Sequence, residues 1–211
     1  PLTMVLCNLS IATMQALPDD AQTSVAEALA GTNAMMVMLD SMLDVSRLEA
    51  GEMPLRPALC DLAHLVREAV RMVQSPSCRQ TVDIAVPPVP VGVDCDPDLV
   101  SRVLYNLIGN AVRCSPAASR VVVRILPLTS HMRIEVEDAA PAIPETFRER
   151  VFERYGQVEC RDHGIKHSSG PGLAFCKLAV EAHHGRIGLL RSPQGGNTFW
   201  FELPTKSPAP T

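Results

Sequence analysis

Two asparagines four residues apart are the side chains of this sequence best placed for chemistry. The stretch PDLVSRVLYNLIGNAVRCS (97–115) predicts a helix with a broad apolar face, on whose edge Asn106 and Asn110 lie one turn apart. Asparagine is a mediocre helix former, and each carboxamide can offer oxygen to a cation or N–H to a phosphate, so the pair suggests a ligand. Two capped or solvated asparagines are the alternative interpretation.

A carboxylate and a glycine-rich loop offer complementary chemistry. His131–Asp138 alternates in polarity as a strand does, and the parity places Asp138 on the apolar side. A buried carboxylate needs a donor, and the exocyclic amine of a bound base would serve; a strand-end aspartate tilted into solvent is the alternative. SSGPG (168–172) precedes a predicted helix, Leu173–His184, whose first turn is suited to phosphate. Glycine is also common in ordinary turns and caps.

The composition limits the classes of protein. With 211 residues, 46% hydrophobic and net charge −4, the chain suits one or two globular domains. It has no basic stripe with interleaved aromatics, which argues against a nucleic-acid partner. Seven cysteines, an odd number without a C-x-x-C pair, favour reduced thiols over disulfides or zinc. The sequence has no long apolar span, so we expect no direct membrane contact from this segment. We expect a cytoplasmic location, either for a soluble protein or for the cytosolic part of a longer one.

The first fifty residues predict a helical hairpin. One helix precedes Pro18, and the second carries a heptad seam that ends near Ala50-Gly51. The seam consists of Val25, Leu29, Thr32, Met36, Leu39 and Leu43. The shorter first helix covers the second only to about residue 36, so residues 37–50 are expected to have no partner within the chain. From this we predict a missing N-terminal continuation and a homodimer through residues 1–50, as a four-helix bundle.

The rest of the sequence predicts alternating helices and strands. Helices are expected at 61–74, 97–115 and 173–184, with a short one near 145–155, and strands at 81–86, 91–94, 120–126, 131–138, 186–190 and 198–203. The predicted fold class is therefore α+β: a helical hairpin followed by an α/β sandwich with a mixed sheet under helices.

The order of these segments resembles the catalytic core of bacterial sensor histidine kinases over nearly all of residues 1–204. DPDLVSRVLYNLIGNAVRCSP (96–116) is similar to the N-box of that family. VEDAAPAIPETFRERVFERYGQ (136–157) resembles its first glycine box and F-box, and SSGPGLAFCKLAVEAHHGRIGL (168–189) its second glycine box. The resemblance implies a dimerisation hairpin at 1–52, a GHKL-type ATP-binding domain at 53–205 and a tail at 206–211.

The resemblance also implies roles for individual residues. Asn110 would coordinate Mg²⁺ bridging the phosphates of ATP, Asn106 and Arg113 would contact the phosphates, and Asp138 would accept from the adenine amino group. Phe152 would anchor the lid. The implied ATP-binding set is Asn106, Asn110, Arg113, Asp138, Ala140, Ala142, Ile143, Gly170, Gly172 and Leu173.

Three departures from the family pattern bear on function. Pro1-Leu2-Thr3 resembles the run directly after the family's phosphoacceptor histidine, so that histidine is expected just upstream and no catalytic residue lies within the chain. Ala140 and Ala142 replace glycines, which predicts strain at positive φ and methyl groups in the way of the nucleotide. Ser168 replaces a further glycine, and Pro171 stiffens the second box and removes an N–H.

Three functions remain open on the sequence. The first is an ATP-dependent histidine kinase that phosphorylates an upstream histidine and passes the phosphate to a response regulator receiver domain. The second is a degenerate kinase that acts as a non-enzymatic dimeric regulatory module with weak or no ATP binding. The third is a gyrase-like ATPase or a protein-serine kinase of the same ATP-binding fold, which the dimerisation hairpin disfavours.

Overall fold

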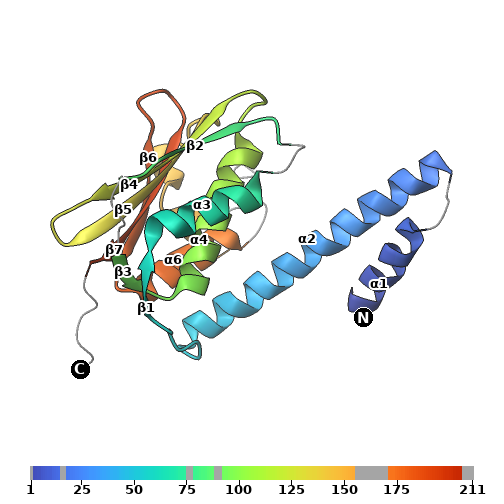
Figure 1. Cartoon of the computed structure of the whole chain (residues 1–211), viewed down its shortest axis with the longest axis horizontal. Coiled ribbons are helices and arrows are strands. Elements are labelled where there is room, and N and C mark those ends of the chain that lie inside the picture. Colours follow the sequence, from blue (N-terminus) through green and yellow to red (C-terminus); the bar gives the residue numbers. More distant parts are fainter. Residues whose placement is uncertain (1, 15–17, 75–77, 88–91, 155–170, 206–211) are drawn as a thin grey trace.

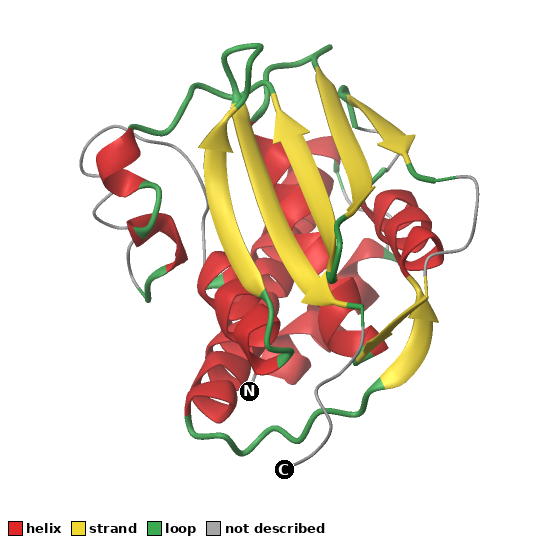
Figure 2. Cartoon of the chain, turned by 90° about the vertical axis from the view of Figure 1, so that its left-hand side faces the viewer, coloured by secondary structure: helices red, strands yellow, loops and turns green. Residues whose placement is uncertain are grey.

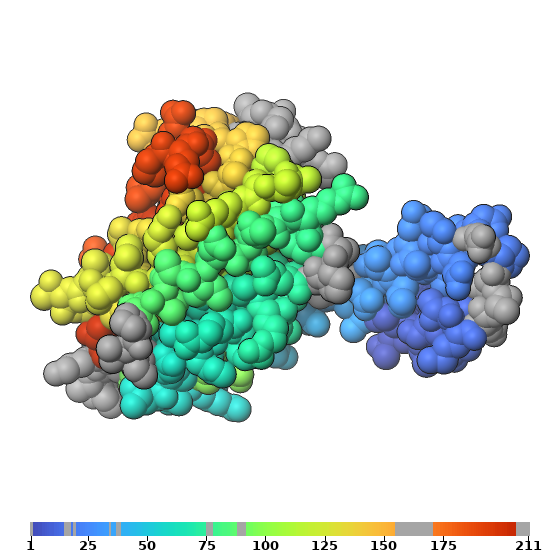
Figure 3. Space-filling view, turned by 45° about the horizontal axis from the view of Figure 1, so that its top comes forward, coloured from blue at the N-terminus to red at the C-terminus, as the bar shows by residue number. Residues whose placement is uncertain are grey.

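The chain consists of a helical hairpin and an α/β sandwich (Figure 1). This computed structural model describes residues 2–14, 18–74, 78–87, 92–154 and 171–205. Helix α1 (Leu2–Thr13) lies beside the N-terminal part of the much longer α2 (Asp19–Glu49), as the sequence predicted. In the space-filling view α1 and the N-terminal part of α2 stand away from the larger domain (Figure 3).

The C-terminal half of α2 packs against the sandwich, which corrects the prediction that residues 37–50 have no partner within the chain. Val45 is only 2% exposed, and α2 contacts α6 (Gly172–Ala182). Asp44 forms an ion pair with Arg102 of α4 (Pro97–Cys114) at 2.6 Å. The prediction was wrong because periodicity shows that a face is apolar but not which element covers it.

A five-stranded mixed sheet forms the second layer of the sandwich. Its strand order is β2-β4-β5-β7-β6. Strands β2 and β4 pair in parallel, and the other three pairs are antiparallel. The bounds are β2 Thr81–Ala85, β4 Arg120–Pro127, β5 His131–Asp138, β6 Arg186–Arg191 and β7 Asn197–Pro204. The mixed sheet agrees with the predicted fold class.

Three helices cover one face of this sheet: α3 (Leu62–Val73), α4 and α6 (Figure 2). Their apolar stripes supply most of the core together with the inward residues of the strands. Side chains define the starts of two of them, because the Asp61 carboxylate accepts from Ala63 N and the Asp96 carboxylate accepts from Leu99 N. A small antiparallel pair, β1 (Ala58–Asp61) with β3 (Gly92–Cys95), lies beside this layer.

His183 at the C-terminal end of α6 has a structural role. Its Nε2 accepts from Asp96 N at 2.9 Å, so Nδ1 carries the proton and donates to Ala179 O at 2.7 Å. The following His184 has φ 57°, and Gly185 lies so close to β7 that an added Cβ would be 2.2 Å from Glu202 O. The end of α6 is thereby fixed to the start of α4 and to the sheet.

Two local predictions differ from the structure. Strand β1 was not anticipated, because four residues between Pro57 and the start of α3 give little periodicity. The short helix expected near 145–155 consists of two single 3₁₀ turns, η1 (Glu145–Phe147) and η2 (Arg150–Phe152). Phe152 is buried and packs edge-to-face against Phe199 with ring centroids 6.1 Å apart, so it anchors this segment on the sheet. Among the described helices, none combines the length and apolarity that crossing a membrane requires.

Candidate nucleotide-binding site

Asp138 ends β5 on the buried side of the sheet, as its strand parity predicted. Met132, Ile134 and Val136 on the same side are buried, and Asp138 itself is 3% exposed. Its Oδ1 accepts three hydrogen bonds, from Ala140 N at 3.0 Å and from Asn197 N and Nδ2 at 3.1 and 3.0 Å. Amide donors from the protein therefore stabilise this buried carboxylate and fix its orientation.

The loop after Asp138 carries the two alanines that stand in glycine positions. The described non-glycine residues with positive φ are Ala118 and His184, so neither Ala140 nor Ala142 adopts positive φ. The strain expected at these alanines is therefore absent, because the loop follows a backbone path that alanine tolerates. The loop is held at both ends. Ala139 N donates to Ser115 Oγ at 3.2 Å, and Ile143 N donates to Asn197 Oδ1 at 2.8 Å.

The two asparagines of α4 lie in different surroundings. Asn110 is 2% exposed, and its Nδ2 has no hydrogen-bond partner among the residues that the structure describes. From the described residues, its Oδ1 accepts one weak bond, from Cys114 Sγ at 3.7 Å. A buried carboxamide with so few partners suits a ligand, and rotation about its last bond can present oxygen to Mg²⁺ or N–H to a phosphate.

Asn106 faces the start of α6. A Cβ added at Gly172 would be 3.1 Å from Asn106 Oδ1, so glycine at this position permits the close approach of α6 to α4. Asn106 also lines a cleft of about 580 Å³ between α2 and α4. Arg113 is exposed in the last turn of α4, where its long side chain can move.

The first turn of α6 presents amide groups to this region. Its N-cap is Pro171, which makes no side-chain capping bond. The first intrahelical bond runs from Phe175 N to Pro171 O at 2.9 Å, which leaves the amides of Gly172, Leu173 and Ala174 without intrahelical acceptors. Leu173 itself is buried. The predicted residues Ser168 and Gly170 lie outside the described residues.

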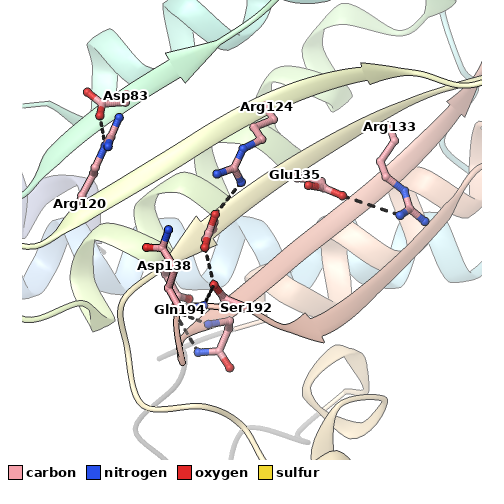
Figure 4. Close-up of polar contacts among 10 residues, drawn as sticks. Asp83, Arg120, Arg124, Arg133, Glu135, Asp138, Ser192 and Gln194 are labelled. Carbon is pink, nitrogen blue, oxygen red and sulfur yellow. Dashed lines mark hydrogen bonds and ion pairs between the residues drawn. The ribbon is translucent and has the colours of Figure 1, made fainter.

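The sheet face opposite the helices supports the end of β5. Arg124 donates to Glu137 at 2.6 Å, and Ser192 Oγ donates to the other carboxylate oxygen (Figure 4). Burial raises the pKa of Glu137, but the bonds from Ser192 and Arg124 outweigh it and hold that pKa below its ordinary value. Ser192 belongs to the β6–β7 turn, so this network connects the turn to the residue next to Asp138.

Sequence reasoning found Asp138 and the asparagines but missed Asn197, Ser115 and Glu137. Asn197 is opposite Asp138 in the β5–β7 register. Both strands were predicted, but their bounds do not fix the register, and an error of one residue would pair Asp138 with a different residue of β7. Taken together, α4, the end of β5 and the start of α6 combine a buried carboxylate, carboxamides and free helix amides. Such a set can recognise a base at one end and phosphates at the other.

Residues 95–207 match the family model of the histidine kinase-, DNA gyrase B- and HSP90-like ATPases, and the chain therefore belongs to this family. Within it, the resemblance to sensor histidine kinases is confirmed. Sensor histidine kinase TmoS from Ectopseudomonas mendocina is 30% identical over 182 residues, covering 83% of this chain and 18% of TmoS. The chain spans less than half the length of the curated relatives it matches.

Solved structures show the same arrangement of elements. Full-length ShkA in complex with AMPPNP matches with a TM-score of 0.79 at 25% identity, covering 100% of this chain and 44% of ShkA. Histidine kinase ThkA in complex with response regulator protein TrrA has a TM-score of 0.71 at 17% identity, covering 98% of this chain and 58% of that one. The fold is thus that of a hairpin joined to a histidine kinase ATP-binding domain.

Proposed function

We propose that this chain is the ATP-binding and dimerisation core of a protein histidine kinase in a two-component system. The observation that carries the proposal is the buried Asp138 carboxylate, held by three amide donors at the end of β5 beside the asparagine helix. In the proposed complex, Asp138 accepts a hydrogen bond from the adenine amino group. Family membership and the AMPPNP complex of ShkA support adenine nucleotide as the ligand.

The phosphate end of the proposed site lies between α4 and α6. Asn106 and Arg113 contact phosphate oxygens, and the amides of Gly172 and Leu173 add donors at the helix N-terminus. Asn110 would hold Mg²⁺ through its buried Oδ1, whose described partner is the weak donor Cys114 Sγ. Bound Mg²⁺ supplies charge neutralisation along the phosphates. The chain itself binds and orients the nucleotide, which is the main contribution of a protein to phosphoryl transfer.

The phosphate acceptor and its onward transfer complete the proposal. The first acceptor would be a histidine immediately upstream of Pro1, and the second a response regulator receiver domain. The complex of ThkA with a response regulator supports a partner of this kind. A homodimer through residues 1–50 and a cytoplasmic location remain predictions.

Calorimetric titration with ATP and Mg²⁺ tests the proposal. Asp138→Asn should weaken binding by about 1–3 kcal/mol, because a buried charge-assisted partner of the base is lost. Asp94→Asn is the control, since Asp94 is an exposed carboxylate in β3, outside the proposed site. Equal affinities of the wild type and the Asp138 variant would refute the assignment of Asp138 to the base.

The degenerate-kinase alternative predicts a different outcome of the same titration. The buried methyl group of Ala140 and the missing N–H of Pro171 favour it. No heat of binding at high micromolar ATP, with the fold intact by circular dichroism, would support a regulatory module in place of the kinase.

A further inference from the structure

Asn197 is the first residue of β7 and lies directly across from Asp138 in the sheet. Its side chain is among the most buried polar groups of the described structure, at 1% exposed. Both its backbone N and its Nδ2 donate to Asp138 Oδ1. Two of the three donors that fix this carboxylate therefore come from one residue.

The rest of the Asn197 carboxamide holds the loop Ala139–Ile143. Nδ2 also donates to Pro141 O at 3.1 Å, and Oδ1 accepts from the buried Ile143 N at 2.8 Å. Both N–H donors and the carbonyl oxygen of the side chain are thereby used. A side chain of this length that both donates and accepts can bridge the carboxylate to the loop; aspartate lacks the donors, and alanine lacks every polar atom.

The β6–β7 turn is shaped to bring Asn197 to this position. A Cβ added at Gly196 would be 1.9 Å from Asp138 O, so this approach of the turn requires glycine. On the other sheet face, Ser192 of the same turn donates to Glu137 and accepts from Gln194 N at 3.1 Å. Figure 4 shows Asp138, Ser192 and Gln194 gathered at this end of the sheet. The turn is therefore fixed to β5 from both faces.

We propose that Asn197 is a positioning residue that sets the Asp138 carboxylate and the loop Ala139–Ile143 in one conformation before nucleotide arrives. The inference rests on the proposed function, in which Asp138 reads the adenine amino group. Asn197 acts through Asp138 and the loop, and it gives them the fixed geometry that base recognition requires. The loop has alanine at both positions where the family has glycine, and the hydrogen bonds from Asn197 hold its shape without glycine.

Discrimination between two nucleotides separates a positioning role from a general loss of stability. ATP carries the 6-amino group that Asp138 would accept from, whereas inosine triphosphate has a carbonyl there. The wild type should prefer ATP at least tenfold in Kd. Asn197→Ala should reduce this preference at least fivefold, whereas adding Asn197→Ala to Asp138→Asn should reduce the preference no further than Asp138→Asn alone. Gln194→Ala, an exposed change in the same turn, should leave it unaltered.

Amide hydrogen exchange provides a second measurement that needs no nucleotide. Asn197→Ala should speed exchange at Ile143 N at least tenfold, because its acceptor is lost. Asn197→Asp keeps an acceptor for Ile143 but opposes a second carboxylate to Asp138. It should therefore retain protection at Ile143 and lose the preference for ATP. Thermal melting of each variant establishes that it is folded.

The outcomes separate this inference from the proposed function. If the wild type binds both nucleotides equally, the assignment of Asp138 to the base is wrong, and exchange at Ile143 alone decides the role of Asn197 in the loop. A wild type that prefers ATP, together with a folded Asn197→Ala variant that keeps the same preference, would overturn the inference and leave the proposed function intact. Unchanged exchange at Ile143 in Asn197→Ala would also overturn it.

Discussion

Asp44 of α2 and Arg102 of α4 form an ion pair with N–O distance 2.6 Å that connects the hairpin to the ATP-binding domain. The Arg102 guanidinium also lies over the Phe175 ring of α6, 4.2 Å from its centroid. One turn further along α4, Asn106 lines the cleft between α2 and α4. Docking of the hairpin and the proposed phosphate contact therefore use neighbouring positions of one helix.

Arg102→Ala should loosen the docking of α2 on the sandwich. The side chains are 39% and 16% exposed, so the ion pair contributes about 1 kcal/mol or less, and the ring contact adds about 0.5–1 kcal/mol. Asp44→Asn should have the smaller effect, since it leaves the ring contact in place. Small-angle scattering should show a larger radius of gyration for the arginine variant. Arg71→Ala, which removes an exposed pair within α3, is the control and should leave the radius unchanged. An unchanged radius in Arg102→Ala would contradict the prediction.

Glu137 should make stability depend on pH in acid. Its pKa is below its ordinary value of about 4.3 in the fold, so its stabilising contribution is full above that value and is lost as the pH falls through the folded pKa. Glu137→Gln should reduce the free energy of unfolding at pH 7 by about 1–3 kcal/mol, because Arg124 and Ser192 lose a charged acceptor. The free energy of unfolding, measured by urea denaturation, should fall more steeply between pH 7 and pH 3 for the wild type than for Glu137→Gln. Parallel pH profiles for the two proteins would show that Glu137 has no such role.

The fold was largely predictable because its elements are long and strongly periodic. The strand His131–Asp138 was predicted with its observed bounds, and the helix 97–115 to within one residue. The packing of α2 was not predictable, since its apolar stripe suits a second chain and the sandwich equally well. The apolar residues of this helix are divided in the structure: Val45 is buried against the domain, whereas Leu39 and Leu43 remain exposed.

The candidate site was predictable only where a side chain had an unusual local setting. Asp138 was identified because a carboxylate at an apolar strand position needs a donor. Asn197 was not, because asparagine after two glycines is ordinary in a turn, and its importance arises from the residue across the sheet. The expected strain at Ala140 rested on the family's glycine pattern and not on this chain's backbone, whose φ there is not positive.

The hairpin should form a homodimer through its exposed apolar side chains. Those that remain exposed on α1 and α2 are Met4, Val5, Ile11, Met35, Leu39 and Leu43. Multi-angle light scattering should give twice the chain mass of 22.8 kDa at micromolar concentration. Leu39→Lys together with Leu43→Lys should shift the protein toward monomer, while Met72→Lys at an exposed position of α3 should not. A wild type that stays monomeric at high micromolar concentration would disprove dimerisation through residues 1–50.

Restoring the two family glycines should not improve nucleotide binding. Ala140 and Ala142 lack positive φ, so Ala140→Gly with Ala142→Gly relieves no backbone strain. Each glycine instead raises the conformational entropy of the unfolded chain, which costs about 0.5–1 kcal/mol per site, and the first also removes a methyl group that is 1% exposed. The double variant should melt at a lower temperature and bind ATP with Mg²⁺ no more tightly than the wild type.

Ala139→Gly is the matched control for this pair of changes, because Ala139 lies in the same loop but is exposed and outside the two glycine positions. It should be destabilised by the added entropy of the unfolded chain at one site, without any loss of packing in the folded state. If the double variant gained tenfold or more in ATP affinity while Ala139→Gly did not, the methyl groups of Ala140 and Ala142 would be obstructing the nucleotide. The departures from the glycine pattern would then be a device that weakens ATP binding, and the regulatory-module interpretation would gain over the kinase.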